Sequence, residues 1–371
     1  MFKKTQVTIL IATLTMQVQS MENAKPTDVI FDGRRTTNNS FFNFYQSKKS
    51  FKNEYRIDKI CLRKNIPANS VVNLIIPART KDGRQVVLDK KACAGWNNPN
   101  IKINLYFVAT ERLKTNKHKG RNKLRVRYKR NFDYVKIVSD KTEFFKDSAS
   151  LLHCDMSGID NKPAKYSKGN EKKNKNFMTS MFDGCSNVKS IKWGKFYPRK
   201  VTRMDYMFRG CAKLENLNLK LNTAQVRTMK GMFSDCSTLE KLKMRISRTS
   251  KLQNMDEMFK GCKSLPYVDL KKFDMQSVQT MQGTFGGCEQ IESIEWSKNA
   301  KAPSLPNANM KGIFKNCFLL KSLIFDTKDP KQNIIPSAEI PYFIGELQGT
   351  KEAIFLNKLA VKFNAKLVNC Y

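Results

Sequence analysis

Apolar side chains recur through the middle of the chain in one eight-residue phrase, for example MDYMFRGC at residues 204–211. Each copy begins with Met, has Phe at its fifth position and ends with Cys. The cysteines are Cys185, Cys211, Cys236, Cys262, Cys288 and Cys317, at steps of 25 to 29 residues, and the phenylalanines are Phe182, Phe208, Phe233, Phe259, Phe285 and Phe314. A fixed period in this range predicts a stacked array of coils.

The phrase itself has the spacing of a helix. Met204, Met207, Phe208 and Cys211 lie at positions i, i+3, i+4 and i+7, which form one face of an α-helix. The residue before each Cys is Gly, Asp or Asn, and these types best tolerate a positive φ. The pattern therefore predicts a short helix that ends in a left-handed turn before the cysteine.

A strand is predicted after each cysteine. In the copy that contains Cys211, apolar residues follow at Leu214, Leu217 and Leu219, and the last two alternate as in a strand with one buried face. Strands of successive copies would stack in parallel. The predicted fold class is thus an α/β solenoid with one short helix and one short parallel strand per repeat.

The sulfur-rich phrase raises the question of a Cu(I) site, because thioether and thiolate are soft ligands. The second Met of the phrase is replaced by Thr284 in the fifth copy and by Ile313 in the sixth. A packed core tolerates such replacements and a ligand set does not, so we expect no metal or other cofactor. The six cysteines are expected to be buried free thiols, whereas Cys61 and Cys93 are a possible disulfide pair.

The phrase Met-x-x-Met-Phe-x-Gly-Cys-x-x-Leu-x-x-Leu-x-Leu resembles the repeat of BspA-type leucine-rich surface proteins, including the related mycoplasma lipoprotein-type repeats. The return loop LKKFDMQSVQTM at Leu270 to Met281 is also similar. The resemblance extends over about Glu143 to Phe325. It implies an exported or surface-displayed solenoid of leucine-rich-repeat type, without enzymatic activity, that is associated with adhesion and with binding of a host or other partner.

The chain divides into four predicted parts. Residues 1–20 resemble a signal peptide: a short cationic start, an apolar run too short to span a bilayer, and a small residue at the expected cleavage site. Residues 21–140 are a β-rich domain, interpreted as a small sandwich or barrel with a hairpin at Asp82-Gly83. Residues 141–325 hold one degenerate repeat at Phe145 to Met156, which has Asp147 and Ser148 in place of Gly and Cys, and six clear repeats, with a Lys-rich insertion at 161–176. Residues 326–371 cap the array.

These features predict a secreted or cell-surface protein. No lipid-accepting cysteine follows the apolar run, and no transmembrane segment or C-terminal anchor is recognisable. The sequence does not set the oligomeric state.

The formal net charge of +36 favours contact with polyanions such as acidic glycans or nucleic acid. The stretch Arg112 to Arg130 contains ten Lys or Arg and no acid. Within it Lys123, Arg125, Arg127 and Lys129 alternate with apolar residues, so a strand would place four cations on one face. Such a strand either contacts a polyanion or is a solvated edge whose charges prevent aggregation.

On the repeats, the outward strand positions predict a second basic patch formed by Lys192, Lys220, Lys243, Arg245 and Lys271. The alternative is an ordinary solvated face. No catalytic motif is present, which argues against an enzyme. The leading hypothesis is a binding protein whose solenoid face engages a protein or glycan. The alternative is a polyanion binder that acts through the strand at 112–130 and the Lys-rich loop.

Overall fold

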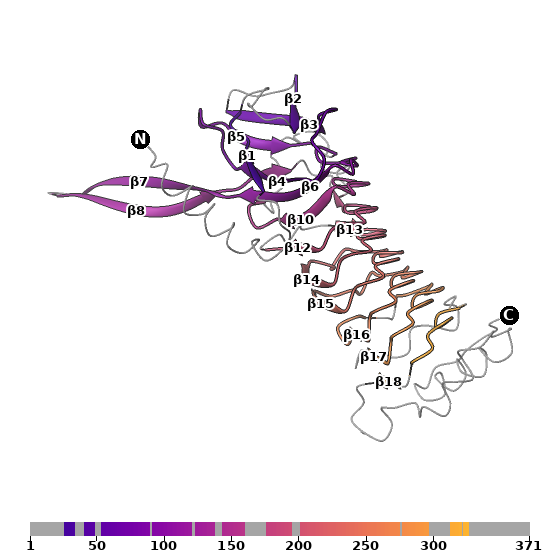
Figure 1. Ribbon diagram of the computed structural model, residues 1–371. Coiled ribbons are helices and arrows are strands. Elements are labelled where there is room, and N and C mark those ends of the chain that lie inside the picture. Colours follow the sequence, from indigo (N-terminus) through magenta and orange to yellow (C-terminus); the bar gives the residue numbers. More distant parts are fainter. Residues whose placement is uncertain are drawn as a thin grey trace.

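Stacked parallel strands form the body of the protein (Figure 1). The computed structural model describes residues 26–33, 41–48, 53–89, 91–120, 123–137, 143–159, 176–194, 201–274, 277–296, 312–320 and 322–325; the side chains of 111–133, 176, 177, 296 and 322–325 are not described. The predicted signal peptide, the cap at 326–371 and nearly all of the Lys-rich insertion lie outside these residues. Within the described residues every regular element is a strand.

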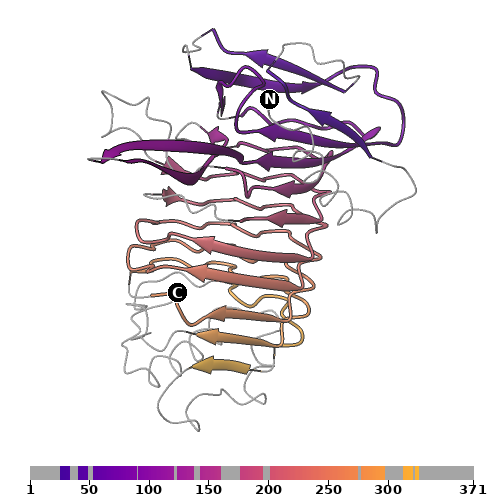
Figure 2. The same cartoon turned by 90° about the vertical axis from the view of Figure 1, so that its left-hand side faces the viewer.

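One long parallel sheet runs from the N-terminal region into the repeats. Its strands, in spatial order, are β1 (Thr27–Ile30), β4 (Ser70–Pro77), β6 (Ile101–Val108), β10 (Leu151–Asp155), β12 (Ser190–Lys192), β14 (Asn216–Leu221) and β15 (Lys241–Ile246). A second parallel stack continues with β16 (Tyr267–Leu270), β17 (Ser293–Trp296) and β18 (Ser322–Phe325). The two stacks follow one another along the molecule (Figure 2).

The N-terminal region is β-rich, as predicted, but its main sheet is shared with the repeats, so it is not a self-contained sandwich or barrel. A smaller sheet lies beside it, made of β2 (Phe42–Gln46), β3 (Glu54–Leu62), β5 (Gln85–Leu88) and β9 (Lys136–Ile137). The turn at Gly83 forms, with φ of 85°. A short antiparallel hairpin forms around it, with a bridge between Arg79 and Gln85 and the N–H of Val86 donating to the carbonyl of Ala78 at 2.9 Å. Beyond this bridge the flanking strands separate, because β4 joins the long sheet and β5 joins the smaller one.

Two further strand pairs complete the described part. The strands β7 (Thr110–Gly120) and β8 (Lys123–Asp133) form an antiparallel hairpin that projects away from the stacked strands (Figure 1). The short strands β11 (Asn176–Phe177) and β13 (Val201–Arg203) pair in parallel.

The predicted helix does not form in the described repeats. Residues 204–211 make successive turns, in which the N–H of Cys211 donates to the carbonyl of Phe208 at 3.1 Å. Tyr206 and Gly210 adopt φ of 55° and 70°, which a right-handed helix excludes. Every second N–H from Met204 to Gly210 instead donates to a carbonyl of the next coil, at 2.8–3.0 Å. The prediction of which residues of the phrase point inward was therefore correct, and the prediction of a helix was wrong. The inward positions of these turns have the same spacing as one face of a helix.

The left-handed position before each cysteine is confirmed. Positive φ is found at Asp147 in the degenerate copy and at Gly184, Gly210, Asp235, Gly261, Gly287 and Asn316 in the six clear ones.

The Met, Phe and Cys side chains of the phrase form the core. Met204, Met207, Phe208 and Cys211 have no exposed surface. The rings of Phe208 and Phe233 stack with centroids 5.5 Å apart and planes inclined by 1°, and the ring of each coil continues this column. Among the described residues, no group of His, Cys, Asp and Glu is arranged to hold a metal ion.

The cysteines form a second column beside the rings. All six are fully buried free thiols. The Sγ of Cys236 donates to the carbonyl oxygen of Phe208 in the preceding coil at 3.1 Å, and the other five make the same contact at 3.0–3.3 Å. Each thiol thus links two coils as well as filling space. Cys61 and Cys93, the possible disulfide pair, are also free.

Among the described residues, no helix has the length and apolar character needed to cross a lipid bilayer.

The buried thiols predict a loss of stability at alkaline pH. Burial raises the pKa of Cys262 well above its ordinary value, and raises that of Cys317 to about 12. A thiol of the unfolded chain ionises near pH 8.5, so each contribution is complete below that pH. Above it, the free energy of unfolding falls by about 1.4 kcal/mol per pH unit and per thiol, until the folded pKa is reached.

We therefore expect Cys262→Ala to lower the free energy of unfolding at pH 8. Between pH 9 and 11 this free energy should fall less steeply than in the wild type, by about 1.4 kcal/mol per pH unit, because one thiol fewer ionises on unfolding. Urea unfolding at several pH values measures this slope. Val268→Ala, a truncation of a buried residue in the same coil, is the control and should leave the slope unchanged. Equal slopes for wild type and Cys262→Ala would contradict the assignment.

Candidate binding surface on the sheet

The strands β14 and β15 present alternate residues to solvent. Leu217, Leu219 and Leu221 point inward and are buried, whereas the residues between them are exposed. The two strands pair in register, with Asn218 opposite Lys243. This pairing brings outward side chains of adjacent strands next to one another.

The outward positions of these two strands, called here the basic face, carry cations and amides only. The basic face consists of Asn216, Asn218, Lys220, Lys241, Lys243 and Arg245. Lys220 and Arg245 are direct register partners, so two like charges face one another across the ladder. An anion bound over them would relieve this repulsion. Three of the predicted patch residues, Lys220, Lys243 and Arg245, are thus brought together.

Lys241 belongs to the same face and sequence reasoning missed it. It is the register partner of Asn216 and is exposed. The strict alternation of Lys241, Leu242, Lys243, Met244 and Arg245 is the signal that could have identified it.

The other two predicted patch residues lie outside the basic face. The Nζ of Lys192 is 2.9 Å from Asp155 Oδ2, and the Nζ of Lys271 is 2.8 Å from Glu295 Oε1. Lys271 also follows β16, which does not pair with β15. The basic face is therefore bordered on both sides by cations that already contact a carboxylate.

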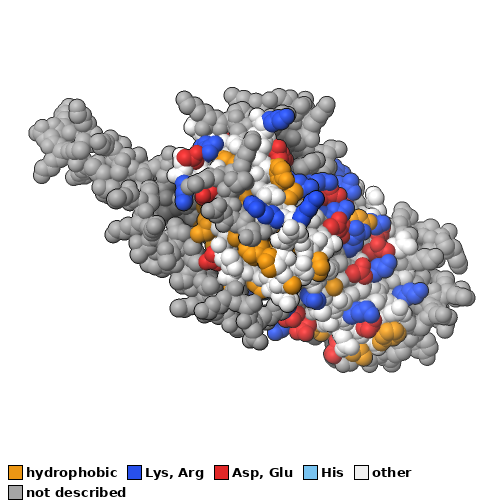
Figure 3. Space-filling model, turned by 45° about the horizontal axis from the view of Figure 1, so that its top comes forward, with side chains coloured by type: hydrophobic (Ala, Val, Ile, Leu, Met, Phe, Trp, Pro, Cys, Tyr) orange, Lys and Arg blue, Asp and Glu red, His pale blue; other side chains and the backbone are white. Residues whose placement is uncertain are grey.

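The turn side of the coils has a different charge pattern. Arg209 donates two hydrogen bonds to Asp183, at 2.7 and 2.8 Å, and Lys260 pairs with Glu257 at 2.8 Å. In Figure 3, acidic and basic side chains lie interspersed on the right-hand part of the face shown. The outward positions of β14 and β15 carry four cations and no carboxylate, so we place the candidate binding surface on the sheet side of the coils.

The second predicted basic element, Lys123 to Lys129, forms a strand, as predicted, and lies within β8. It forms one arm of the projecting hairpin β7–β8 (Figure 1). Alternate residues of a strand share a face, so the backbone places Lys123, Arg125, Arg127 and Lys129 on one side of β8. Their side chains lie outside the described residues.

The ladder of strands is interrupted next to the basic face, and Pro266 explains the break. In the Cys236 coil the N–H of Glu240 donates to the carbonyl of Glu215 at 2.9 Å, and in the Cys288 coil the N–H of Glu292 donates to Pro266 at 2.8 Å. Pro266 occupies the same position in the Cys262 coil and has no N–H to donate. The bond that would begin the pairing of β16 with β15 is therefore missing.

The break exposes apolar surface beside the cations. Leu242, Met244 and Ile246 of β15 are only half-buried, although Leu219 at the matching position in β14 is fully buried. The N–H of Lys241 donates to β14 at 3.1 Å. Since backbone groups of alternate residues point to opposite sides of a strand, those of Leu242 and its alternate neighbours point toward the break. The basic face thus borders an unpaired, partly apolar strand edge.

The comparison with known families concerns the region that contains this surface. Residues 176–297 match the family described as "Mycoplasma protein of unknown function, DUF285". This agrees with the mycoplasma part of the resemblance noted in the sequence. No curated protein and no solved structure matches the chain significantly.

The open edge of β15 predicts a local pattern of amide exchange. The amides of Leu242, Met244 and Ile246 should exchange with solvent at least about tenfold faster than those of β14, because they have no partner strand on the side of the break. Hydrogen exchange followed by NMR or mass spectrometry measures the difference. Pro266→Ala supplies the missing donor and should slow exchange in β15. Equal protection of β14 and β15 in the wild-type protein would contradict the break.

Proposed function

We propose that this protein is an exported or surface-associated binding protein of leucine-rich-repeat type, without enzymatic activity. Its partner is an acidic protein or glycan that lies over the basic face of β14 and β15. The observation that carries the proposal is the set of four cations on two adjacent paired strands, with no carboxylate among the outward residues of either strand.

The unpaired edge of β15 supports the same surface. A partner that covers the break would bury Leu242, Met244 and Ile246, and it would gain about 25 cal/mol for each Å² of apolar area removed from water. Exposed ion pairs contribute only about 0.2–1 kcal/mol each. Charge would therefore steer the partner toward the surface, and apolar contact would hold it there.

Stacked coils suit a function of this kind. The backbone hydrogen bonds between coils fix the strands in register, so the outward side chains are held in rows without any contribution from a ligand. A preformed surface loses little conformational freedom on binding.

The alternative function is polyanion binding through the hairpin β7–β8. The observation that favours it is the projection of this hairpin away from the stacked strands, with ten Lys or Arg and no acid between residues 112 and 130 (Figure 1). The two functions predict different responses to salt. Pure polyanion binding weakens steeply as ionic strength rises, whereas binding with an apolar component persists at about 0.3 M salt.

The test uses charge reversal on the sheet. The variant Lys220→Glu, Lys243→Glu, Arg245→Glu should weaken binding to immobilised extracellular-matrix proteins at least about tenfold at 0.15 M salt, because the attractive field becomes repulsive. Surface plasmon resonance measures the affinity. The matched control Arg227→Glu, Arg248→Glu, Lys251→Glu makes the same charge change at exposed positions outside the strands and should bind as the wild type does.

Equal binding of the two triple variants would refute the role of the basic face. Heparin provides the second arm of the experiment. If Arg125→Glu, Arg127→Glu abolishes heparin binding while matrix binding persists, the hairpin is a separate polyanion site. If it abolishes both, the alternative function replaces the leading one.

A further inference from the structure

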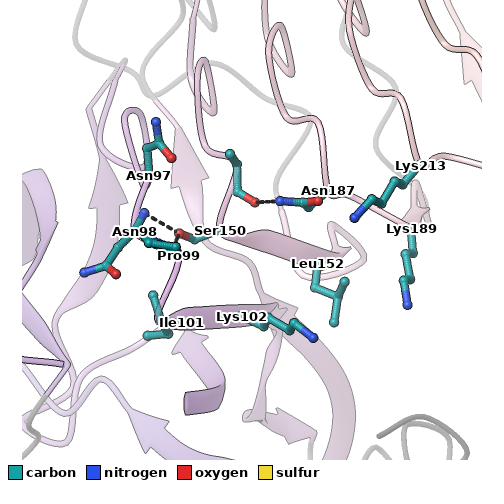
Figure 4. Close-up of a pocket in the computed structure, with 11 residues that line it drawn as sticks. Asn97, Asn98, Pro99, Ile101, Lys102, Ser150, Leu152, Asn187, Lys189 and Lys213 are labelled. Atoms are coloured by element: carbon teal, nitrogen blue, oxygen red, sulfur yellow. Dashed lines mark hydrogen bonds between the residues drawn. The ribbon is translucent and has the colours of Figure 1, made fainter. Parts of the chain in front are cut away.

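A cavity of about 380 Å³ lies at the beginning of β6, β10 and β12 and extends to Lys213, just before β14 (Figure 4). Its lining comes from the segments in which four successive coils enter the sheet. Its apolar part is formed by Ile101, Pro99 and Leu152, and its polar part includes Asn97, Asn98 and Asn187. The volume is near the lower end of the range for ligand sites, about 300–1,000 Å³, and suits a single ring rather than a chain.

The wall of the cavity is fixed by internal hydrogen bonds. The Oγ of Ser150 accepts from the N–H of Asn98 at 2.8 Å and donates to the carbonyl of the same residue at 2.9 Å. The side-chain amide of Asn187 donates to the carbonyl of Ala149 at 2.9 Å. These bonds hold loop residues of neighbouring coils in place, so the cavity exists before any ligand binds.

A bulge in β10 shapes the apolar part. The register passes from Leu151 opposite Ile103 directly to His153 opposite Asn104, so Leu152 is an additional residue in β10. The N–H of Lys189 donates to the Leu152 carbonyl at 2.8 Å and closes the bulge. Bulges of this kind redirect a side chain at functional sites. Here the Leu152 side chain lines the cavity instead of continuing an even alternation.

The charge of the cavity is entirely positive. Lys102, Lys189 and Lys213 line it, each from a different coil, and no Asp or Glu is among the lining residues. Figure 4 shows the three lysines on one side of the cavity, around Leu152. Three ammonium groups around a small apolar surface attract an anion.

We propose that this cavity binds one acidic sugar unit, a ring that carries a carboxylate or sulfate group. The lysines would contact the anionic group, and the asparagine amides, which both donate and accept, would bind hydroxyl groups. Leu152 and Pro99 would contact the C–H face of the ring. None of the lining residues belongs to the basic face, and the proposal does not depend on the proposed function.

The test compares glucuronate with glucose, a neutral ring that lacks the carboxylate. Saturation-transfer NMR or calorimetry on the full chain should detect glucuronate with a dissociation constant on the order of 1 mM, and glucose should bind at least about tenfold more weakly. The variant Lys189→Gln, Lys213→Gln should weaken glucuronate binding at least about tenfold. The control Lys241→Gln, Lys243→Gln removes equal charge from the basic face and should bind glucuronate as the wild type does. An unchanged melting temperature shows that both variants remain folded.

A hyaluronan tetrasaccharide with a terminal glucuronate distinguishes the source of the ligand. If free glucuronate competes with it, the cavity accepts the free sugar acid. If only the tetrasaccharide binds, and the Lys189→Gln, Lys213→Gln variant weakens it, the ligand is the end of a glycan chain. The proposal is overturned if neither compound binds, if glucose binds as well as glucuronate, or if both double variants bind equally.

Discussion

The structure depends on hydrogen bonds between successive coils rather than within them. In an α-helix each N–H is satisfied four residues earlier in the same segment. Here every second N–H of the turn segment donates to the next coil instead, and Tyr206 and Gly210 take left-handed conformations that make this possible. One coil alone would leave these groups unpaired, so a single repeat has no stable structure and each coil is a template for the next.

The side-chain columns follow from this backbone arrangement. Because the coils repeat at one hydrogen-bond spacing, equivalent residues stack directly, and the rings of Phe208, Phe233 and Phe259 lie nearly parallel. The thiol column has a second function. A thiol is small enough for the interior and still donates a weak hydrogen bond to a carbonyl, which alanine cannot do. The contact between Cys236 and Phe208 explains why cysteine, and not merely a small apolar residue, recurs at this position.

Periodicity was sufficient to predict the stacking, the core columns, the parallel strands and the left-handed position before each cysteine. It could not distinguish a helix from a series of turns, because Met204, Met207, Phe208 and Cys211 point inward in both. That distinction depends on φ at the third position of the phrase, which is positive at Tyr206, a residue type with no marked preference for the left-handed region. The glycines at this position in other copies, Gly231, Gly283 and Gly312, also have positive φ and are the signal that could have indicated turns. The tertiary hydrogen bonds determine it, and they are not visible within a single repeat.

The candidate sites show the same limit. Lys220, Lys243 and Arg245 were predictable because strand alternation alone assigns their face. The cavity was not, because Lys102, Lys189 and Lys213 are far apart in sequence and meet only when four successive coils stack.

The missing donor at Pro266 also bears on how the molecule responds to force. In a linear array each interface carries the load in series, and the weakest interface separates first. The turn side keeps its full set of bonds between the Cys236 and Cys262 coils, whereas on the sheet side β15 and β16 are not paired. Tension along the long axis would open the array at this joint, from the strand side, and leave the segments on either side of it intact.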